Sequence, residues 1–132
     1  RKMEVLQNMR SKLEEHVAEL NKIQKDLGKA INNRQGLQAQ LTENQHVKTE
    51  LDLLEDESVV YKLVGPVLVK QDPFEARSNV QKRIGFIEGD LQRMDERIKG
   101  LEKKQDQKRT EVAQLQAKMQ SVVQRAMASA SG

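Results

Sequence analysis

The sequence contains no cysteine and no tryptophan, and aromatic residues make up only 2% of its 132 residues. The absence of cysteine excludes disulfides and thiolate metal sites, and it is typical of a reducing compartment. The scarcity of aromatic side chains argues against a large globular core and against a base-stacking surface for single-stranded nucleic acid. No apolar run reaches the length of a membrane span or forms a signal-peptide core, so we expect no membrane partner.

Charged residues, in contrast, are abundant and well mixed. They make up 33% of the chain, with 23 basic and 20 acidic residues and a net charge of +3. Interspersed charges of both signs are typical of a solvated helix surface. One local basic cluster is diluted by Glu102 and Asp106, so we expect no direct binding to nucleic acid. The cluster consists of Arg97, Lys99, Lys103, Lys104, Lys108 and Arg109.

Two heptad runs of nearly equal length flank a short β-rich centre. Apolar residues recur at the first and fourth heptad positions, a and d, which form the seam of a coiled coil. In the first run, a and d alternate through Leu6, Met9, Leu13, His16, Leu20, Ile23, Leu27, Ala30, Arg34, Leu37, Leu41, Asn44, Lys48 and Leu51. In the second run they alternate through Val80, Ile84, Ile87, Leu91, Met94, Ile98, Leu101, Gln105, Lys108, Val112, Leu115, Met119, Val122 and Ala126.

The two runs can be folded onto each other as an antiparallel pair. When residues whose numbers add up to 135 are paired, every a position lies opposite a d position. This register predicts the contacts Leu13–Val122, Leu20–Leu115, Leu41–Met94 and Leu51–Ile84, and it places His16 opposite Met119. The two ends of the sequence should therefore lie side by side.

The same register predicts a cluster of polar layers in the seam. Leu27 would face Lys108, Ala30 would face Gln105, and Arg34 would face Leu101. The long stems of lysine and arginine can lie along a seam while their charged ends reach water. Two interpretations stay open: a locally weakened coil whose register is fixed by these layers, or a functional flexing point. Gly28, Gly36 and Gly100 lie nearby and lower the local helix propensity.

The centre of the chain has the alternation of a β-hairpin. Val59, Tyr61 and Leu63 should share one face of a strand, and Gly65-Pro66 marks the turn, although proline does not suit the favoured two-residue turns. Apolar residues occupy both faces, and an isolated hairpin is marginally stable in water. We therefore expect companion chains to supply further strands. The predicted assembly residues are Val59, Val60, Tyr61, Leu63, Val64, Val67, Leu68 and Val69.

The sequence thus predicts an α-dominated fold, namely a long antiparallel two-helix coiled coil with a central hairpin. Asp72-Pro73 marks the start of the return helix, because aspartate is a good N-cap and proline suits the first helical position. The chain is expected to form one domain, 1–132. Its expected parts are a first helix at 1–57, a hairpin at 58–71, a second helix at 72–126 and a flexible tail at 127–132.

No catalytic, cofactor or metal site is predicted. The two histidines, His16 and His46, fall at a seam position and on the outer face, and two are too few for a histidine metal site. No phosphate-binding glycine-rich loop is present. The acidic clusters lack a convergent base, and a two-helix rod has no obvious pocket. We therefore expect a protein that is not an enzyme and needs no cofactor.

The ends of the two runs carry apolar residues that the register brings together. Their close approach could be ordinary closure of the seam, or it could be a weak and adaptable grip on exposed apolar segments of other proteins. The candidate client-binding residues at this tip are Met3, Val5, Leu6, Met9, Met119, Val122, Val123 and Met127.

Three blocks of the sequence resemble the β-class subunits of prefoldin. The residues are Gln-Leu-Thr-Glu-Asn at 40–44, the hairpin segment 60–71 and Glu-Ala-Arg at 75–77. The resemblance extends over about 24–120, and the hairpin block is its most specific part. The termini match the family less well. A single central hairpin resembles the β class, because an α-class chain would carry a second one.

The resemblance implies a subunit of a cytoplasmic, ATP-independent co-chaperone. Such hexamers contain two α-class and four β-class subunits, whose hairpins form an intermolecular β-barrel from which the coils project. The coil tips would hold unfolded actin and tubulin for transfer to the cytosolic chaperonin. The alternative is a passive coiled-coil scaffold or tether that assembles through the same hairpin but has no affinity for unfolded chains.

Overall fold

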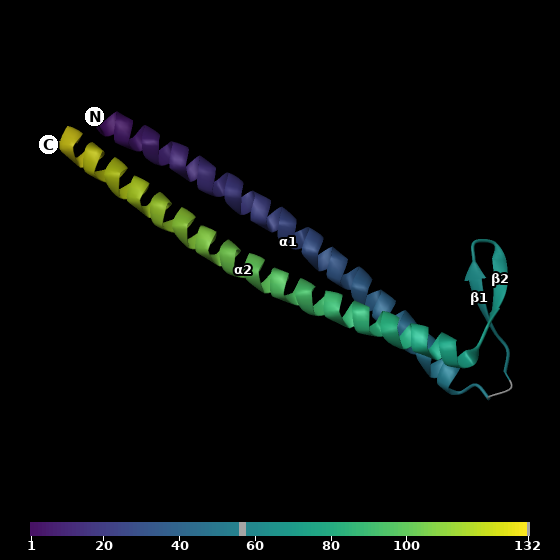
Figure 1. The fold of residues 1–132 in the computed structure, drawn as a ribbon. Coiled ribbons are helices and arrows are strands. Elements are labelled where there is room, and N and C mark those ends of the chain that lie inside the picture. Colours follow the sequence, from purple (N-terminus) through teal and green to yellow (C-terminus); the bar gives the residue numbers. More distant parts are fainter. Residues whose placement is uncertain (56–57, 132) are drawn as a thin grey trace. The chain divides into compact units, whose positions relative to one another are not determined.

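The computed structural model describes residues 1–55 and 58–131, which form two long helices with one hairpin between them along the chain (Figure 1). Helix α1 spans Lys2–Asp52, strands β1 and β2 span Val60–Val64 and Val67–Gln71, and helix α2 spans Pro73–Ser131. The predicted fold class, two long helices with a small antiparallel hairpin, is confirmed.

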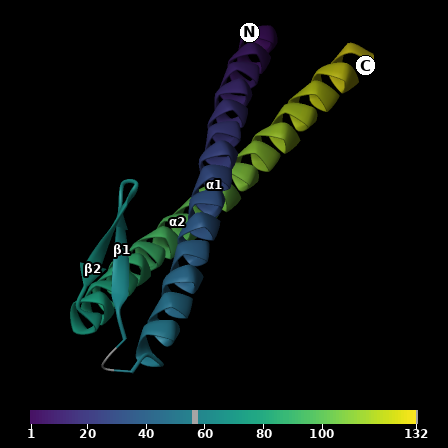
Figure 2. The same cartoon turned by 90° about the vertical axis from the view of Figure 1, so that its right-hand side faces the viewer.

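The contacts divide the chain into two compact units. Unit 1 combines residues 1–31 with 97–132, and unit 2 contains residues 32–96, including the hairpin. In unit 1 the beginning of α1 and the end of α2 lie at the same end of the helix pair (Figures 1 and 2). This shared end is called the tip below.

The heptad pattern describes the burial of both helices. All 28 predicted a and d positions are at least partly shielded from solvent, from Leu6 to Leu51 in α1 and from Val80 to Ala126 in α2. Between Leu6 and Leu51, the only other shielded residue of α1 is Asp26. Such a regular stripe is what a coiled-coil seam requires, because a and d side chains repeat on one side of each helix.

The helices run antiparallel within each unit, but the register predicted from the sequence is wrong by one heptad. In unit 1, the paired residues His16–Glu111 and Glu19–Lys108 have numbers that add up to 127. In unit 2, the numbers of the Arg34–Asp95 pair add up to 129. These values lie close to 128, which is seven less than the predicted 135. A slide of seven residues keeps every a position opposite a d position, so the apolar pattern alone does not distinguish the two registers.

Unit 2 contains the best-shielded part of the seam. Leu41, Ile84, Ile87 and Leu91 are 5–8% exposed and form one apolar cluster, against which Leu37 and Val80 pack. The predicted contact of Leu41 with Met94 is thus replaced by contacts with residues three to ten positions earlier in α2. In unit 1 the most shielded residues are Ala30, at 2%, and Leu101, at 9%.

The hairpin is a two-stranded antiparallel sheet with a two-residue turn. Val64 pairs with Val67 and Leu63 with Leu68, so Gly65 and Pro66 alone form the turn. Gly65 has a φ of 58°, and no other described residue has a positive φ. A positive φ at the first turn residue followed by the fixed negative φ of proline matches a type II′ turn. Proline at the second position therefore fits this turn, contrary to the sequence-based expectation.

The start of α2 is as predicted. The Asp72 carboxylate Oδ1 accepts a hydrogen bond from the backbone N–H of Phe74 at 3.2 Å, and the Asp72 carbonyl accepts one from Ala76 at 2.9 Å. Aspartate therefore serves as the N-cap, and Pro73 occupies the first helical position, where its missing N–H costs nothing.

The other helix boundaries differ from those expected. Helix α1 ends at Asp52 instead of residue 57; of the five expected residues, 56 and 57 lie outside the described residues. The guanidinium of Arg77 donates from Nε to the Leu51 carbonyl at 3.0 Å and from a terminal nitrogen to the Leu54 carbonyl at 3.3 Å. These bonds add partners to carbonyls at the end of the helix, where the Leu51 carbonyl also accepts a bond from the backbone N–H of Leu54 at 3.3 Å.

The end of α2 shows the opposite difference. The helix continues to Ser131, whereas a flexible tail was expected from residue 127. This segment is rich in alanine, with Ala126, Ala128 and Ala130, and alanine has the highest helix propensity of the amino acids.

Candidate functional site

The hairpin exposes apolar side chains on both of its faces. The strand pairing places Tyr61, Leu63 and Leu68 on one face and Val64, Val67 and Val69 on the other. Exposed fractions range from 48% for Val69 to 67% for Leu63, while Val60 is half-buried. We call the seven exposed side chains the hairpin surface: Val59, Tyr61, Leu63, Val64, Val67, Leu68 and Val69.

A sheet of this kind has two features that favour a partner. Each strand has a free edge with unpaired backbone groups, and each face has apolar area in contact with water. Contiguous exposed apolar patches mark interaction surfaces, and free sheet edges are templates for added strands. The described chain covers neither face, so the hairpin surface is available to another polypeptide.

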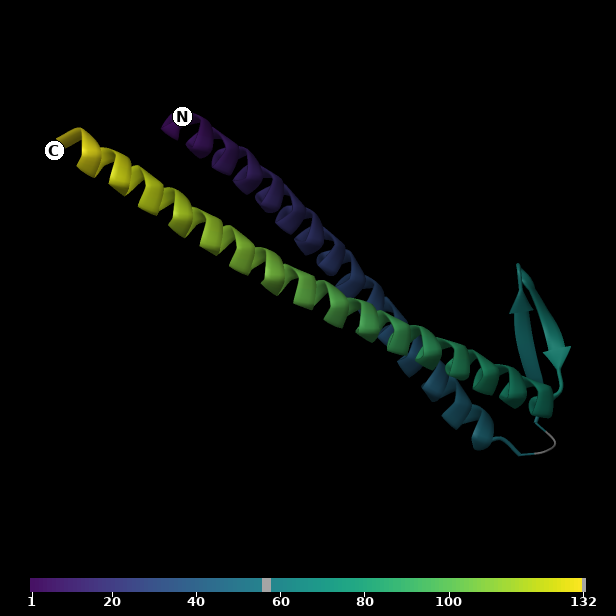
Figure 3. The same cartoon turned by 60° about the vertical axis from the view of Figure 1, so that its left-hand side comes forward.

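A groove at the base of the hairpin extends this surface onto the helices. It has a volume of about 460 Å³, and its walls combine Val60 and Gln71 of the strands with Val47 of α1 and Val80 of α2. Phe86 also lines it and is 73% exposed. Figure 3 shows the hairpin beside the first turns of α2. Phe86 was not predicted from the sequence, because it lies outside the heptad pattern. A large apolar residue at a non-seam position was the signal that could have identified it.

Arg77 fixes the place where the chain leaves α1 for the hairpin. Its two hydrogen bonds to the carbonyls of Leu51 and Leu54 connect the first turns of α2 to the end of α1. Ala76, beside it, is 5% exposed, which leaves little room for a larger side chain at this packed corner. Ala76 and Arg77 of the Glu-Ala-Arg block thus fix the first turns of α2 against the end of α1.

The structure brings together four of the eight predicted tip residues. Met3, Leu6, Met119 and Val123 line one groove of about 420 Å³, which we call the tip groove. Gln7 and Arg10 complete its lining; sequence analysis did not select them, although their spacing from Met3 places them on the same side of α1. Met9 and Val122 are instead half-buried in the seam, and Val5 and Met127 are exposed outside the groove.

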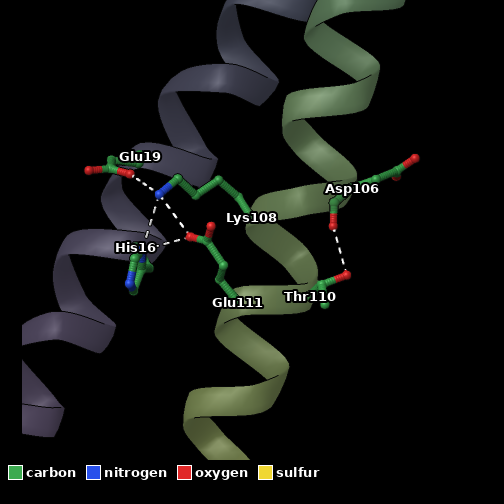
Figure 4. A network of polar contacts seen from close by, with 6 residues as sticks. All are labelled: His16, Glu19, Asp106, Lys108, Thr110 and Glu111. Atoms are coloured by element: carbon green, nitrogen blue, oxygen red, sulfur yellow. Dashed lines mark hydrogen bonds and ion pairs between the residues drawn. The ribbon is translucent and has the colours of Figure 1, made fainter.

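A polar cluster interrupts the seam of unit 1 (Figure 4). The ammonium group of Lys108 pairs with Glu19 across the seam and with Glu111 on its own helix, the latter at 3.0 Å. His16 Nδ1 lies 3.2 Å from Lys108 Nζ and 3.3 Å from Glu111 Oε2. A neutral ring would accept a hydrogen bond from Lys108, whereas a protonated ring would donate one to Glu111.

This cluster shows how a lysine is accommodated at a seam position. The side chain of Lys108 is only 22% exposed, so its stem lies along the helices while its charged end reaches two carboxylates. The expected partner of Lys108 was Leu27, and the one-heptad difference in register replaces it with His16 and Glu19. The same shift gives Arg34 an acidic partner, Asp95, in place of Leu101.

The ion pairs shift two pKa values in opposite directions. The hydrogen bond from Lys108 lowers the pKa of Glu19 below its ordinary value, and the hydrogen bonds to Glu19 and Glu111 raise the pKa of Lys108. Since the folded chain holds Glu19 ionised, the pair stabilises the fold above the ordinary carboxyl pKa, and this contribution is lost as the pH falls from there through the lowered pKa of Glu19.

Replacing Lys108 with glutamine is expected to raise the pKa of Glu19 toward its ordinary value, because the donated hydrogen bond and the nearby positive charge are lost. NMR titration of the Glu19 side-chain carboxyl carbon measures this change. Lys104→Gln is the matched control, since Lys104 is exposed and pairs with no carboxylate in the described part of the chain. An unchanged Glu19 titration in Lys108→Gln would refute the cross-seam pair.

Among residues 1–55 and 58–131, no group of three or more histidine, cysteine, aspartate or glutamate side chains converges as a metal site would require. Within the same residues, neither helix has a stretch apolar enough to serve as a membrane span.

Comparison with known proteins agrees with this architecture. Residues 14–126 match the family model described as "Prefoldin subunit". The chain is 46% identical over 124 residues to prefoldin subunit 6 of Canis lupus familiaris, covering 94% of this chain and 95% of the relative. It is 45% identical over 117 residues to prefoldin subunit 6 of Arabidopsis thaliana, covering 89% and 91% of the two chains.

A solved structure shares the same fold. The crystal structure of the prefoldin beta subunit from Thermococcus strain KS-1 aligns with a TM-score of 0.56 and 26% sequence identity, covering 83% of this chain and 90% of that one. The family match spans most of the chain, and the relatives are covered almost completely. The chain therefore belongs to the prefoldin subunit family, whose members are components of a chaperone complex.

Proposed function

We propose that this chain is a β-class subunit of a cytoplasmic, hexameric, ATP-independent co-chaperone that holds unfolded proteins at its coil tips. Unfolded actin and tubulin are the proposed clients, and the cytosolic chaperonin is the proposed recipient. Membership in a family of chaperone-complex subunits supports this proposal. The observation that carries it is the presence of two separate apolar surfaces, one on the hairpin and one at the tip.

The hairpin surface is suited to assembly. The seven exposed apolar side chains, six on the two-stranded sheet and Val59 just before it, would bury a large area if neighbouring subunits added strands at both edges. Closure of several hairpins into one β-barrel would remove the free edges altogether. We propose that α-class and other β-class prefoldin subunits complete this barrel.

The tip groove is suited to weak capture of unfolded chains. Two of its apolar residues, Met3 and Met119, have flexible thioether side chains that adapt to irregular apolar shapes. Met3 is 83% exposed and Val123 is 41% exposed, so apolar surface is accessible without rearrangement of the seam. A shallow groove of this kind holds an apolar side chain without requiring a nucleotide-driven step.

Replacing Met3, Val123 and Met127 with serine is expected to weaken client holding while leaving the hexamer intact, because these exposed residues lie outside the seam and far along the sequence from the hairpin. The assay dilutes denatured actin into the assembled complex without nucleotide and follows aggregation by light scattering. The wild-type complex should suppress aggregation, and the three-residue variant should suppress it at least several-fold less efficiently.

The control is Val17→Ser with Ile31→Ser, which removes two exposed apolar side chains of α1 outside the tip. Native mass spectrometry must show the same subunit composition for the wild-type complex, the tip variant and the Val17/Ile31 control. If the wild-type complex does not suppress aggregation, the passive scaffold is the better description. If the wild-type complex and the tip variant protect actin equally, the holding surface lies elsewhere.

A further inference from the structure

We propose that the tip groove selects unfolded segments in which a carboxylate lies next to an apolar side chain. This inference deepens the proposed function and rests on it, because it specifies the chemistry of the client segment that the tip would hold. It is carried by the composition of the groove, by the exposed side chain of Arg10, which forms no ion pair within the described residues, and by the charge of the surrounding residues.

The groove combines four apolar side chains with one charged group. Met3, Leu6, Met119 and Val123 provide an apolar floor from both helices, whereas Gln7 and Arg10 of α1 provide the polar part of the lining. The volume of about 420 Å³ accommodates one or two apolar side chains of a client. A segment seated there would bring its neighbouring residues within reach of the guanidinium of Arg10.

Arg10 forms no ion pair within the described part of the chain. The ion pairs of unit 1 involve His16, Glu19, Lys108 and Glu111, all further from the tip. The side chain of Arg10 is exposed, so its five N–H donors are hydrated and available. A carboxylate can form two parallel hydrogen bonds with a guanidinium, a geometry that a hydroxyl or a single carbonyl does not reproduce.

The residues around the groove carry a net positive charge, the same sign as that of Arg10. Residues 1–12 and 116–132 carry six positive side chains and one negative side chain, a net charge of +5, whereas the whole chain carries only +3. The positive residues are Arg1, Lys2, Arg10, Lys12, Lys118 and Arg125, and the negative one is Glu4. This excess attracts acidic segments over a distance of about 10 Å at moderate ionic strength and repels basic ones.

The test uses the assembled complex and three synthetic peptides that carry a photo-reactive benzophenone. The first peptide alternates leucine with aspartate, the second alternates leucine with lysine, and the third has serine in place of leucine and keeps the aspartates. Intact-mass analysis after irradiation quantifies the adduct on this chain separately from adducts on the other subunits. The leucine–aspartate peptide should label this chain with about fivefold higher apparent affinity than the leucine–lysine peptide.

Two substitutions distinguish the contribution of the Arg10 guanidinium from that of the surrounding positive charge. Arg10→Gln should remove most of the preference for the acidic peptide, and Arg10→Lys should retain a large part of it. Lys12→Gln is the matched control, because Lys12 has the same charge but does not line the tip groove. An equal loss of preference in Lys12→Gln and Arg10→Gln would overturn the assignment to Arg10.

The outcomes also distinguish this inference from the proposed function. Equal labelling by the two leucine-containing peptides would overturn the charge preference while client capture at the tip stands. Failure of both leucine-containing peptides to label this chain would overturn capture by this groove and the preference with it. Equal labelling by the serine–aspartate and leucine–aspartate peptides would show plain charge attraction, and it would overturn the requirement for an apolar side chain.

Discussion

Replacing Leu63 and Leu68 with aspartate is expected to abolish assembly with other prefoldin subunits while both helices stay folded. The two leucines are direct cross-strand partners, and their side chains are 67% and 63% exposed in the single chain. Burying a leucine side chain contributes about 1.5–3 kcal/mol, and an unpaired charge at a buried interface costs additional free energy. A loss of about 4 kcal/mol would raise the dissociation constant about a thousand-fold.

Native mass spectrometry of the subunits mixed at micromolar concentration measures this effect. Circular dichroism should show helix content close to that of the wild type, because neither leucine contacts the seam. Val17→Asp combined with Ile31→Asp is the matched control, since it places the same two charges on exposed apolar positions of α1. Normal assembly of the Leu63/Leu68 variant would refute the hairpin surface as the assembly site.

Replacing Leu41 with alanine is expected to lower the free energy of unfolding of unit 2 by about 2–4 kcal/mol. Leu41 is 8% exposed and is the only α1 residue among the four buried members of the apolar cluster. Its truncation would leave a cavity facing Ile84, Ile87 and Leu91, and an antiparallel pair of helices has few other side chains that can move in to fill it. Hydrogen exchange of the α1 amides around Leu41 in the assembled complex measures the change.

The same residue tests the register. Leu41→Ala and Ile87→Ala should show a coupling energy of about 1 kcal/mol in a double-mutant cycle, because the two side chains belong to one packed cluster. Leu41→Ala and Met94→Ala should be additive, since Met94 is not part of that cluster. Strong coupling to Met94 without coupling to Ile87 would instead support the register whose paired numbers add up to 135.

Much of the local structure follows directly from the sequence. The heptad pattern identifies every seam position from Leu6 to Leu51 and from Val80 to Ala126, because burial along a helix repeats with the same period as the apolar residues. The N-cap at Asp72 and the turn at Gly65 are likewise local, since each depends on side chains or backbone angles within a few residues.

The functional surfaces were identified to different extents. The hairpin surface could be predicted because apolar residues on both faces of a two-stranded sheet are visible in the alternation itself. At the tip, the sequence pointed to Met3, Leu6, Met119 and Val123 but missed Gln7 and Arg10. The spacing of Gln7 and Arg10 places them on the side of α1 that carries Met3, but only the position of α2 beside α1 shows that this side lines the groove.

The sequence by itself determined the two helices, their buried sides and the hairpin between them, because these depend on short-range periodicity. Only the tertiary structure decided which heptad lies opposite which, where α1 ends and which charged groups meet. A slide of seven residues preserves the apolar match, so the choice depends on specific contacts between distant residues. Lys108 with Glu19, Arg34 with Asp95, and Arg77 with the Leu51 carbonyl are such contacts, and all three form in the observed register.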